Sequence, residues 1–272
     1  MRNVFVVVLA AAGMTIVGAQ GAGAADLGVP YTPPPPPPSW TGFYIGLNGG
    51  AGWGTTATSV NVGQTLALNG IPGINLSVPL AQTSLNGWLA GGQIGYNYQI
   101  GNYLVGIEGE GDWANISGTS PCAVVFSCTS KVKWTADIAG RFGVVPIANL
   151  LVYVKGGVSW AGLQSSFGNG ISGTVGPITF AGDVNANLNT TQVGGLLGIG
   201  TEYMFAPNWT AKIEYTYADY GKENFTVPVN AAGGVAIAGG PTLAGSTSFP
   251  TSVQSQLQVH TVKFGINYLF NL

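Results

Sequence analysis

The sequence predicts an all-β protein: an eight-stranded antiparallel transmembrane up-and-down β-barrel with long external loops. Charged residues make up only 7% of the 272 residues, against about 25% in ordinary globular domains, and the mean hydropathy is +0.33. Beyond the N-terminus, however, glycine or polar residues interrupt every run of roughly 18 residues, so membrane-spanning helices are not supported. Apolar residues recur instead at alternate positions, which is typical of strands that face lipid on one side.

The closing segment His260–Phe270 shows this alternation most clearly. Successive side chains of a strand point to opposite faces of its sheet. A soluble sheet shows the same pattern where its apolar face covers a core, so the other segments have to decide between the two cases. One parity of the closing segment is wholly apolar, and it consists of Val262, Phe264, Ile266, Tyr268 and Phe270.

Seven further alternating segments precede the closing one, and turn residues separate them. Eight strands is an even number, which predicts that both ends of the barrel chain lie on the same side of the membrane. The seven segments are Thr41–Trp53, Asn86–Gln99, Tyr103–Ala114, Lys131–Val145, Leu150–Trp160, Gln192–Phe205 and Trp209–Tyr217.

The connections between these segments are alternately long and short. Short periplasmic turns and long external loops are the pattern of outer-membrane barrels. An extra hairpin within Leu66–Leu80 would raise the strand number to ten. The short connections are Gly101–Asn102, Pro146–Asn149 and Ala206–Asn208, and the long ones are Gly54–Leu85, Asn115–Ser130, Ala161–Thr191 and Ala218–Gln256.

Aromatic residues gather at the ends of the expected strands. An aromatic ring that carries a polar group prefers the headgroup level of a bilayer, so these residues predict two aromatic girdles. They are Trp40, Trp53, Trp88, Tyr103, Trp113, Trp134, Trp160, Trp209, Tyr268 and Phe270.

The charged residues fall on the parity opposite the apolar one, which places them in the lumen. The interior of an eight-stranded barrel is just wide enough for side chains, and an isolated buried ion costs several kcal/mol. We therefore expect a filled, ion-paired lumen, with inward glycines making room for the long side chains. The acids are Glu108, Glu110, Asp112, Asp137, Glu202 and Glu214, and the bases are Lys131, Lys133, Arg141, Lys155, Lys212 and Lys263, six of each sign.

The N-terminal residues predict export. Residues 1–24 read as a secretory signal peptide, with Arg2, a short apolar run and a small-residue cleavage site at Ala22-Gly23-Ala24. A transmembrane anchor is the alternative. Residues 25–39 form a proline-rich periplasmic spacer, whose run Pro33–Pro38 favours an extended polyproline helix. A partner that binds such helices could recognise this run. Residues 40–272 then form the barrel.

Four segments of the chain carry a family resemblance: WTGFYIGLNGGAGWG at 40–54, GGQIGYNYQIGNYLVGIEGEGDW at 91–113, GTEYMFAPNWTAKIEYTYADYG at 200–221 and the closing HTVKFGINYLF. They resemble the small eight-stranded outer-membrane β-barrel proteins of Gram-negative bacteria. These OmpA/OmpX-like proteins are often described as porin-family or outer-membrane immunogenic proteins. The resemblance implies a location in the cell outer membrane, a structural or envelope-integrity role, and contact with outer-membrane lipid and lipopolysaccharide.

The resemblance also implies insertion by the barrel-assembly machinery, which reads an aromatic-rich last strand. The assembly signal would be the outward row of that strand. The chain departs from the family pattern in ending Phe270-Asn271-Leu272 instead of on the aromatic residue. The row is Phe264, Ile266, Tyr268 and Phe270.

Few residues suggest other chemistry. Cys122 and Cys128 lie in one long connection, where an exported chain can keep a disulfide; metal binding and free thiols are the alternatives. His260 is the single histidine and could serve Ser252 or Ser255 as a base, but no acid motif supports this, so we expect a structural residue. Glu108 and its acidic neighbours could form an acid–base or metal cluster, although ion pairing fits their lysine-rich surroundings better. We expect no catalytic residue, metal site or cofactor.

Three functions remain open on the sequence alone. The first is a structural outer-membrane barrel with a packed lumen, and the second is a narrow porin that passes small solutes. The third is an enzyme that uses His260. A net charge of −2 and a pI near 5.2 provide no basic patch, which argues against a nucleic-acid partner.

Overall fold

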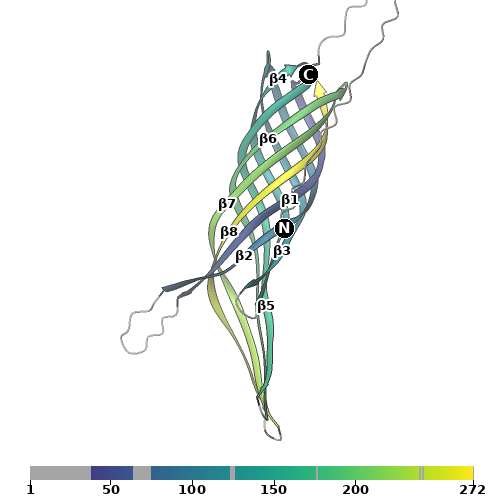
Figure 1. The fold of residues 1–272 in the computed structure, drawn as a ribbon. Helices are drawn as coiled ribbons and strands as arrows, with labels where there is room; N and C mark the ends of the chain where they lie inside the picture. Colours follow the sequence, from purple (N-terminus) through teal and green to yellow (C-terminus); the bar gives the residue numbers. More distant parts are fainter. Residues whose placement is uncertain are drawn as a thin grey trace, which may run out of the picture. The chain divides into compact units, whose positions relative to one another are not determined.

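The computed structural model describes residues 38–63, 75–122, 126–175, 177–238, 240 and 242–271, and nearly all of them lie in strands. Each strand pairs antiparallel with the next along the chain, and the last pairs with the first, so the sheet closes into a barrel (Figure 1). Within these ranges no helix is long and apolar enough to cross a membrane. The strands are β1 (Gly42–Gly63), β2 (Asn75–Ile100), β3 (Tyr103–Cys122), β4 (Phe126–Ile147), β5 (Leu150–Val175), β6 (Ile178–Ala206), β7 (Trp209–Ile237) and β8 (Thr242–Asn271).

Closure of the barrel depends on the ladder between β1 and β8. This ladder runs from Gly42 opposite Asn271 to Asn61 opposite Ser252. A closed sheet has no edge, so every backbone group at membrane depth has a partner within the wall. The predicted eight-stranded barrel is confirmed, and the last six residues of the segment Leu66–Leu80, from Asn75 onward, belong to β2. Residues 64–74 lie outside the described ranges, as do the signal peptide and most of the spacer, which remain predictions.

Three tight turns connect β2 to β3, β4 to β5 and β6 to β7. In the first, Gly101 has a φ of 61°, which glycine adopts without the steric cost of a Cβ atom. In the third, Asn208 has a φ of 67°, and its amide Nδ2 donates to the carbonyl of Leu269 at 2.5 Å. Asparagine is among the few other residues that tolerate this region. The short connections predicted from the sequence are therefore confirmed.

The segments expected to be long loops are instead mostly strand. The β5–β6 ladder continues to Val175 opposite Ile178, and the β7–β8 ladder continues to Ala236 opposite Thr242. Near their tips β6 and β7 pair again after an interruption between Asn185 and Gly195, and in Figure 1 these two hairpins run on together beyond the barrel. These stretches show no apolar alternation because neither face meets lipid, and a ladder needs only its backbone hydrogen bonds.

The outer wall of the barrel is strongly apolar. Leu47 is 74% exposed, Leu197 68% and Phe264 62%. A continuous exposed apolar surface of this kind is rare on proteins that face water, and it is the expected outer face of a membrane barrel. The alternation of the sequence therefore sorts the apolar residues to the outside, as predicted.

Glycines on the inner wall are sterically required. A Cβ atom added to Gly95 would lie 2.3 Å from the hydroxyl of Tyr44 and 2.6 Å from the carbonyl oxygen of Ile107. Gly111, on the outer wall of the neighbouring strand, has no atom within 4 Å of an added Cβ. The narrow interior thus needs glycine where large side chains of other strands cross it.

One aromatic residue departs from the predicted girdles. Trp40 is 1% exposed, and its indole N–H donates to the carbonyl of Ala148 at 3.1 Å. Its backbone N–H donates to Oε1 of Gln99 at 3.0 Å. Trp40 precedes β1 and turns into the turn-side mouth of the barrel, so the prediction that it faces the headgroups is wrong. Trp40 shares the parity of Tyr44 and Asn48, which also face inward, so the alternation of the first strand, extended back to Trp40, places it inside.

Candidate functional site: the lumen of the barrel

Charged side chains line the middle of the lumen. Ten of the twelve charged residues predicted there are buried in the structure: Glu108, Glu110 and Asp112 from β3, Asp137 and Arg141 from β4, Lys155 from β5, Glu202 from β6, Lys212 and Glu214 from β7, and Lys263 from β8.

The two exceptions are Lys131 and Lys133, and for them the prediction is wrong. The β4–β5 register shifts between Val132 and Trp134, so Lys133 is an extra residue in a β-bulge. A bulge of one residue reverses the parity of everything beyond it. Val132 is consequently inside the barrel, at 0% exposure, and Lys133 is exposed on the outer surface, with Lys131 partly exposed.

Arg141 organises one end of the ionic layer. Its guanidinium lies 2.9 Å from Oε2 of Glu202 and 3.4 Å from Oε2 of Glu108. It also donates to the hydroxyl of Tyr44 at 2.6 Å, and that hydroxyl donates to Glu108 at 2.8 Å. The ring centre of Tyr153 is 4.0 Å from the guanidinium carbon, close enough for a cation–π contact. Arg141 is thus held by two carboxylates and two tyrosines.

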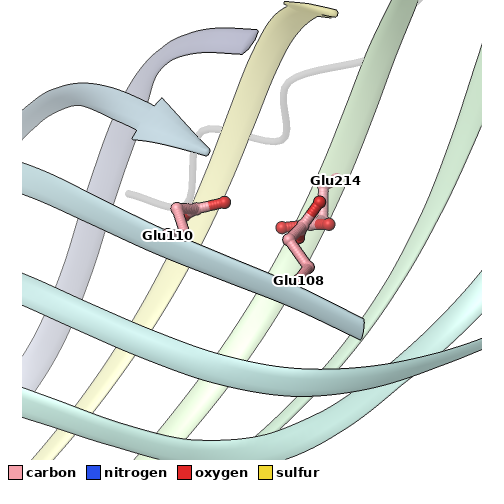
Figure 2. Close-up of side chains that lie close together, drawn as sticks. All are labelled: Glu108, Glu110 and Glu214. Carbon is pink, nitrogen blue, oxygen red and sulfur yellow. The ribbon is translucent and has the colours of Figure 1, made fainter. Parts of the chain in front are cut away.

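Three glutamates converge beside this arginine. Carboxylate oxygens of Glu108 and Glu110 on β3 and of Glu214 on β7 lie within 4.8 Å of one another (Figure 2). Oxygen clusters of this kind can hold a divalent cation. Here two ammonium groups fill the space: Nζ of Lys155 lies 2.7 Å from Glu214 and 3.1 Å from Glu108, and Nζ of Lys212 lies 3.4–3.8 Å from all three. The cluster is therefore an ion-pair network, in which the two ammonium groups lie where a cation would be bound.

The rest of the network is less evenly paired. Lys263 contacts Glu110 and lies 3.3 Å from Asp112. Asp137 has no ion pair with any described residue, and its Oδ1 accepts no hydrogen bond from them. With Lys131 and Lys133 outside, the described part of the lumen holds six acids and four bases, a formal excess of two negative charges. The predicted balance of six and six is therefore wrong.

Neutral polar side chains connect the charges across the lumen. The amide of Asn48 donates to Gln93 at 2.7 Å, Gln93 donates to Asn267 at 2.6 Å, and Asn267 donates to Oε1 of Glu202 at 2.6 Å. On another side, the hydroxyl of Tyr153 donates to Glu214 at 2.7 Å. Asn48, Gln93 and Asn267 were not among the predicted lumen residues, although all three lie on the inward parity.

Buried apolar side chains lie in the lumen on both sides of the ionic layer. Along β3 the inward residues run from Leu104 through Glu108, Glu110 and Asp112 to Ile116, and both apolar ends are 0% exposed. The turn-side cluster contains Trp40, Tyr44, Leu104, Val145, Leu151, Tyr153, Met204 and Leu269. The hairpin-side cluster contains Leu85, Leu89, Ala114, Ile116, Val132, Ala139, Ala161, Leu163, Leu196, Ala218, Tyr220, Leu257 and Val259.

The single histidine belongs to the outer surface. Nδ1 of His260 is 2.7 Å from the hydroxyl of Tyr215, and its ring stacks on Trp53 at 5.8 Å between centres. Ser255 is 2% exposed and faces the lumen, on the opposite parity of the same strand. The structure therefore does not bring Ser255 and His260 together, and His260 lies among girdle aromatics.

The cysteines lie at the tip of the β3–β4 hairpin. The backbone of Cys128 pairs with Ser120, and that of Cys122 pairs with Phe126. Cys128 is not a free thiol. The side chain of Cys122 lies outside the described residues, so the disulfide between Cys122 and Cys128 stays a prediction.

The closed wall, apolar outer face and polar interior define a transmembrane β-barrel. The chain belongs to the outer membrane protein beta-barrel domain family, whose sequence profile matches residues 9–270. It is 28% identical to the 31 kDa outer-membrane immunogenic protein of Brucella melitensis over 99% of this chain and all of the relative. It is 24% identical to the 25 kDa outer-membrane immunogenic protein of Brucella abortus over 85% of this chain and 80% of that protein.

Solved outer-membrane proteins also align with the chain. The outer membrane protein OprG of Pseudomonas aeruginosa matches with a TM-score of 0.39 and 11% identity, over 85% of this chain and 97% of OprG. The outer membrane protease OmpT of Escherichia coli matches with a TM-score of 0.37 and 10% identity, over 84% and 97%. Family membership, and not these distant likenesses, places the protein in the outer membrane.

Proposed function

We propose that this protein is a structural, surface-exposed component of the outer membrane whose lumen does not conduct. The observation that carries the proposal is the layered lumen, in which buried ion pairs lie between two buried apolar clusters. Water and ions would have to displace side chains that already fill an eight-stranded barrel. The protein then serves the envelope as a stable wall element and as a support for the long hairpins.

The hairpins support the surface-exposed part of the proposal. In barrels of this class the short turns face the periplasm and the longer connections face outward. The Brucella relatives are described as outer-membrane immunogenic proteins, and we extend to this chain the surface exposure that such a description fits. Outer-membrane lipid, lipopolysaccharide and, during insertion, the barrel-assembly machinery are the proposed partners.

Planar-bilayer recording with the purified mature protein tests the closed lumen. We expect no current steps above those of the protein-free bilayer, while a general porin in the same chamber shows steps. The alternative is a narrow pore, and the excess of lumen acids makes it cation-selective. Current steps that survive repurification, and whose cation selectivity falls in Asp137→Asn, would establish the pore and refute the closed barrel.

A further inference from the structure

The bulge in β4 places two cations on the outer surface directly beside the aromatic girdle. Trp134, which pairs with Trp113 of β3, is 37% exposed, and Trp113 is 76% exposed. Lys133 and Lys131 precede Trp134 on the hairpin side of the strand. Tryptophan marks the headgroup level of a bilayer, so both ammonium groups lie at the level of the lipid headgroups or just outside it.

Neutral hydrogen-bonding side chains continue the row across the next strands. Lys131 is opposite Gln164 of β5, and Gln164 is opposite Asn189 of β6. Neither lysine is paired with a carboxylate among the described residues, and the stretches 113–122, 126–136 and 160–175 contain no acid. The positive charge on this part of the rim is therefore uncompensated by the protein.

A hollow of about 260 Å³ lies beside Lys133. Its walls come from three strands: Lys133 and Trp134 from β4, Gly162, Leu163 and Gln164 from β5, and Asn189, Thr190 and Thr191 from β6. An added Cβ on Gly162 would lie 2.2 Å from the indole nitrogen of Trp134, so glycine at this position lets the indole lie flat against the wall. The hollow combines a cation, an aromatic face and several amide and hydroxyl groups.

We propose that this hollow binds the phosphorylated sugar headgroup of a lipid in the outer leaflet. Lys131 and Lys133 pair with the phosphate through charge-assisted hydrogen bonds. Gln164, Asn189 and Thr191 bond to sugar hydroxyls, and the indole of Trp134 covers a sugar face. Basic pockets at the membrane surface select anionic headgroups in the same way. The site rests on the outward orientation of the hairpins in the proposed function, but it does not depend on whether the lumen conducts.

Binding of a fluorescent lipid A analogue, a phosphorylated glucosamine lipid, to the full mature protein in neutral detergent micelles tests the site. The variant Lys131→Gln/Lys133→Gln removes both charges, and Lys222→Gln removes an exposed lysine of β7 as a matched control. Each lysine near a membrane surface contributes about a fivefold factor to anionic-lipid binding, so we expect about thirty-fold weaker binding in the double variant. Binding to Lys222→Gln should match the wild type.

Two further binding measurements identify the ligand. A dephosphorylated analogue should bind the wild type and the double variant equally weakly, and inorganic phosphate should not displace the phosphorylated analogue at equal concentration. Unchanged affinity in the double variant, or the same loss in Lys222→Gln, would overturn the site. If inorganic phosphate alone displaced the analogue, the ligand of the site would be a free anion, and the assignment to a lipid headgroup would be wrong. Heat-modifiable migration of each variant in electrophoresis confirms that it is folded, and bilayer recording tests the proposed function separately.

Discussion

At the scale of the residue, the stability of the barrel depends on how the buried charges of the lumen are paired. Arg141 has a side-chain exposure of 0% and contacts two glutamates whose side chains are at most 4% exposed. A buried pair adds little when it replaces apolar packing, but breaking one leaves an uncompensated charge in a low-dielectric interior. The loss of one partner is therefore more informative than the count of ion pairs.

Arg141→Ala should strongly destabilise the barrel, because Glu108 and Glu202 lose their shared cation. We expect a loss of about 3–5 kcal/mol in the free energy of unfolding, measured by urea unfolding of the protein in lipid vesicles. Lys222→Ala, which removes an exposed lysine, should change stability by less than about 0.5 kcal/mol. Equal stability of Arg141→Ala and the wild type would show that the network is not paired as described.

Gly95→Ala and Gly111→Ala form a matched pair on neighbouring strands. The first inserts a methyl group against the Tyr44 hydroxyl and a backbone carbonyl, whereas the second extends it into open space on the outer wall. We expect Gly95→Ala to cost about 1–3 kcal/mol and Gly111→Ala to be neutral or stabilising by up to about 1 kcal/mol. The same urea titration measures both, and a reversed order would contradict the assigned inner and outer faces.

At the scale of the element, strand identity was predictable and strand length was not. Alternation between lipid and lumen marks each spanning segment, so the eight strands could be read from the sequence. Beyond the girdles neither face meets lipid, and residues such as Ser165 and Ser166 of β5, the first buried and the second partly exposed, show no apolar contrast. The bulge at Lys133 was hidden for another reason: Lys131, Val132 and Lys133 alternate regularly, and an inserted residue leaves no compositional mark.

The closing strand offers a prediction about assembly. Phe270 and Phe205 are both outward, 50% and 53% exposed, but only Phe270 lies in the proposed assembly signal of β8. Phe270→Ala should lower the folded amount recovered from outer membranes, while Phe205→Ala should leave it unchanged. Folding of both purified variants into detergent should be alike, because each loses a similar lipid contact. A defect shared by both variants in cells would point to lost stability instead of lost recognition.

At the scale of the whole molecule, the sequence could predict which charged residues of the site face the lumen. Ten of twelve charged residues lie where alternation placed them, because one face of every spanning strand had to exclude charge. Pairing partners such as Arg141 with Glu202, from β4 and β6, depend on how the sheet closes. Which residues meet across the lumen therefore required the three-dimensional structure.

The final prediction concerns the orientation of the barrel in the membrane. In a background with Cys122 and Cys128 replaced by serine, Ser172→Cys places a thiol on the β5–β6 hairpin, and Asn102→Cys places one in the β2–β3 turn. Both positions are exposed. A membrane-impermeant maleimide should label Ser172→Cys in intact cells and Asn102→Cys only after the outer membrane is opened. The opposite labelling would invert the topology and remove the basis for the lipid site.

The ionic layer also constrains how the chain enters its membrane. Each of β3 to β8 carries at least one residue of that layer, and a lone hairpin crossing hydrocarbon would turn such a residue toward acyl chains at about 2–4 kcal/mol near the midplane. Glu214 pairs with Lys155 of β5, and Lys263 pairs with Glu110 and Asp112 of β3. Stepwise entry therefore meets a barrier at each hairpin from β3 onward, whereas simultaneous entry with sealing of the first and last strands keeps the paired charges beside their counterions throughout.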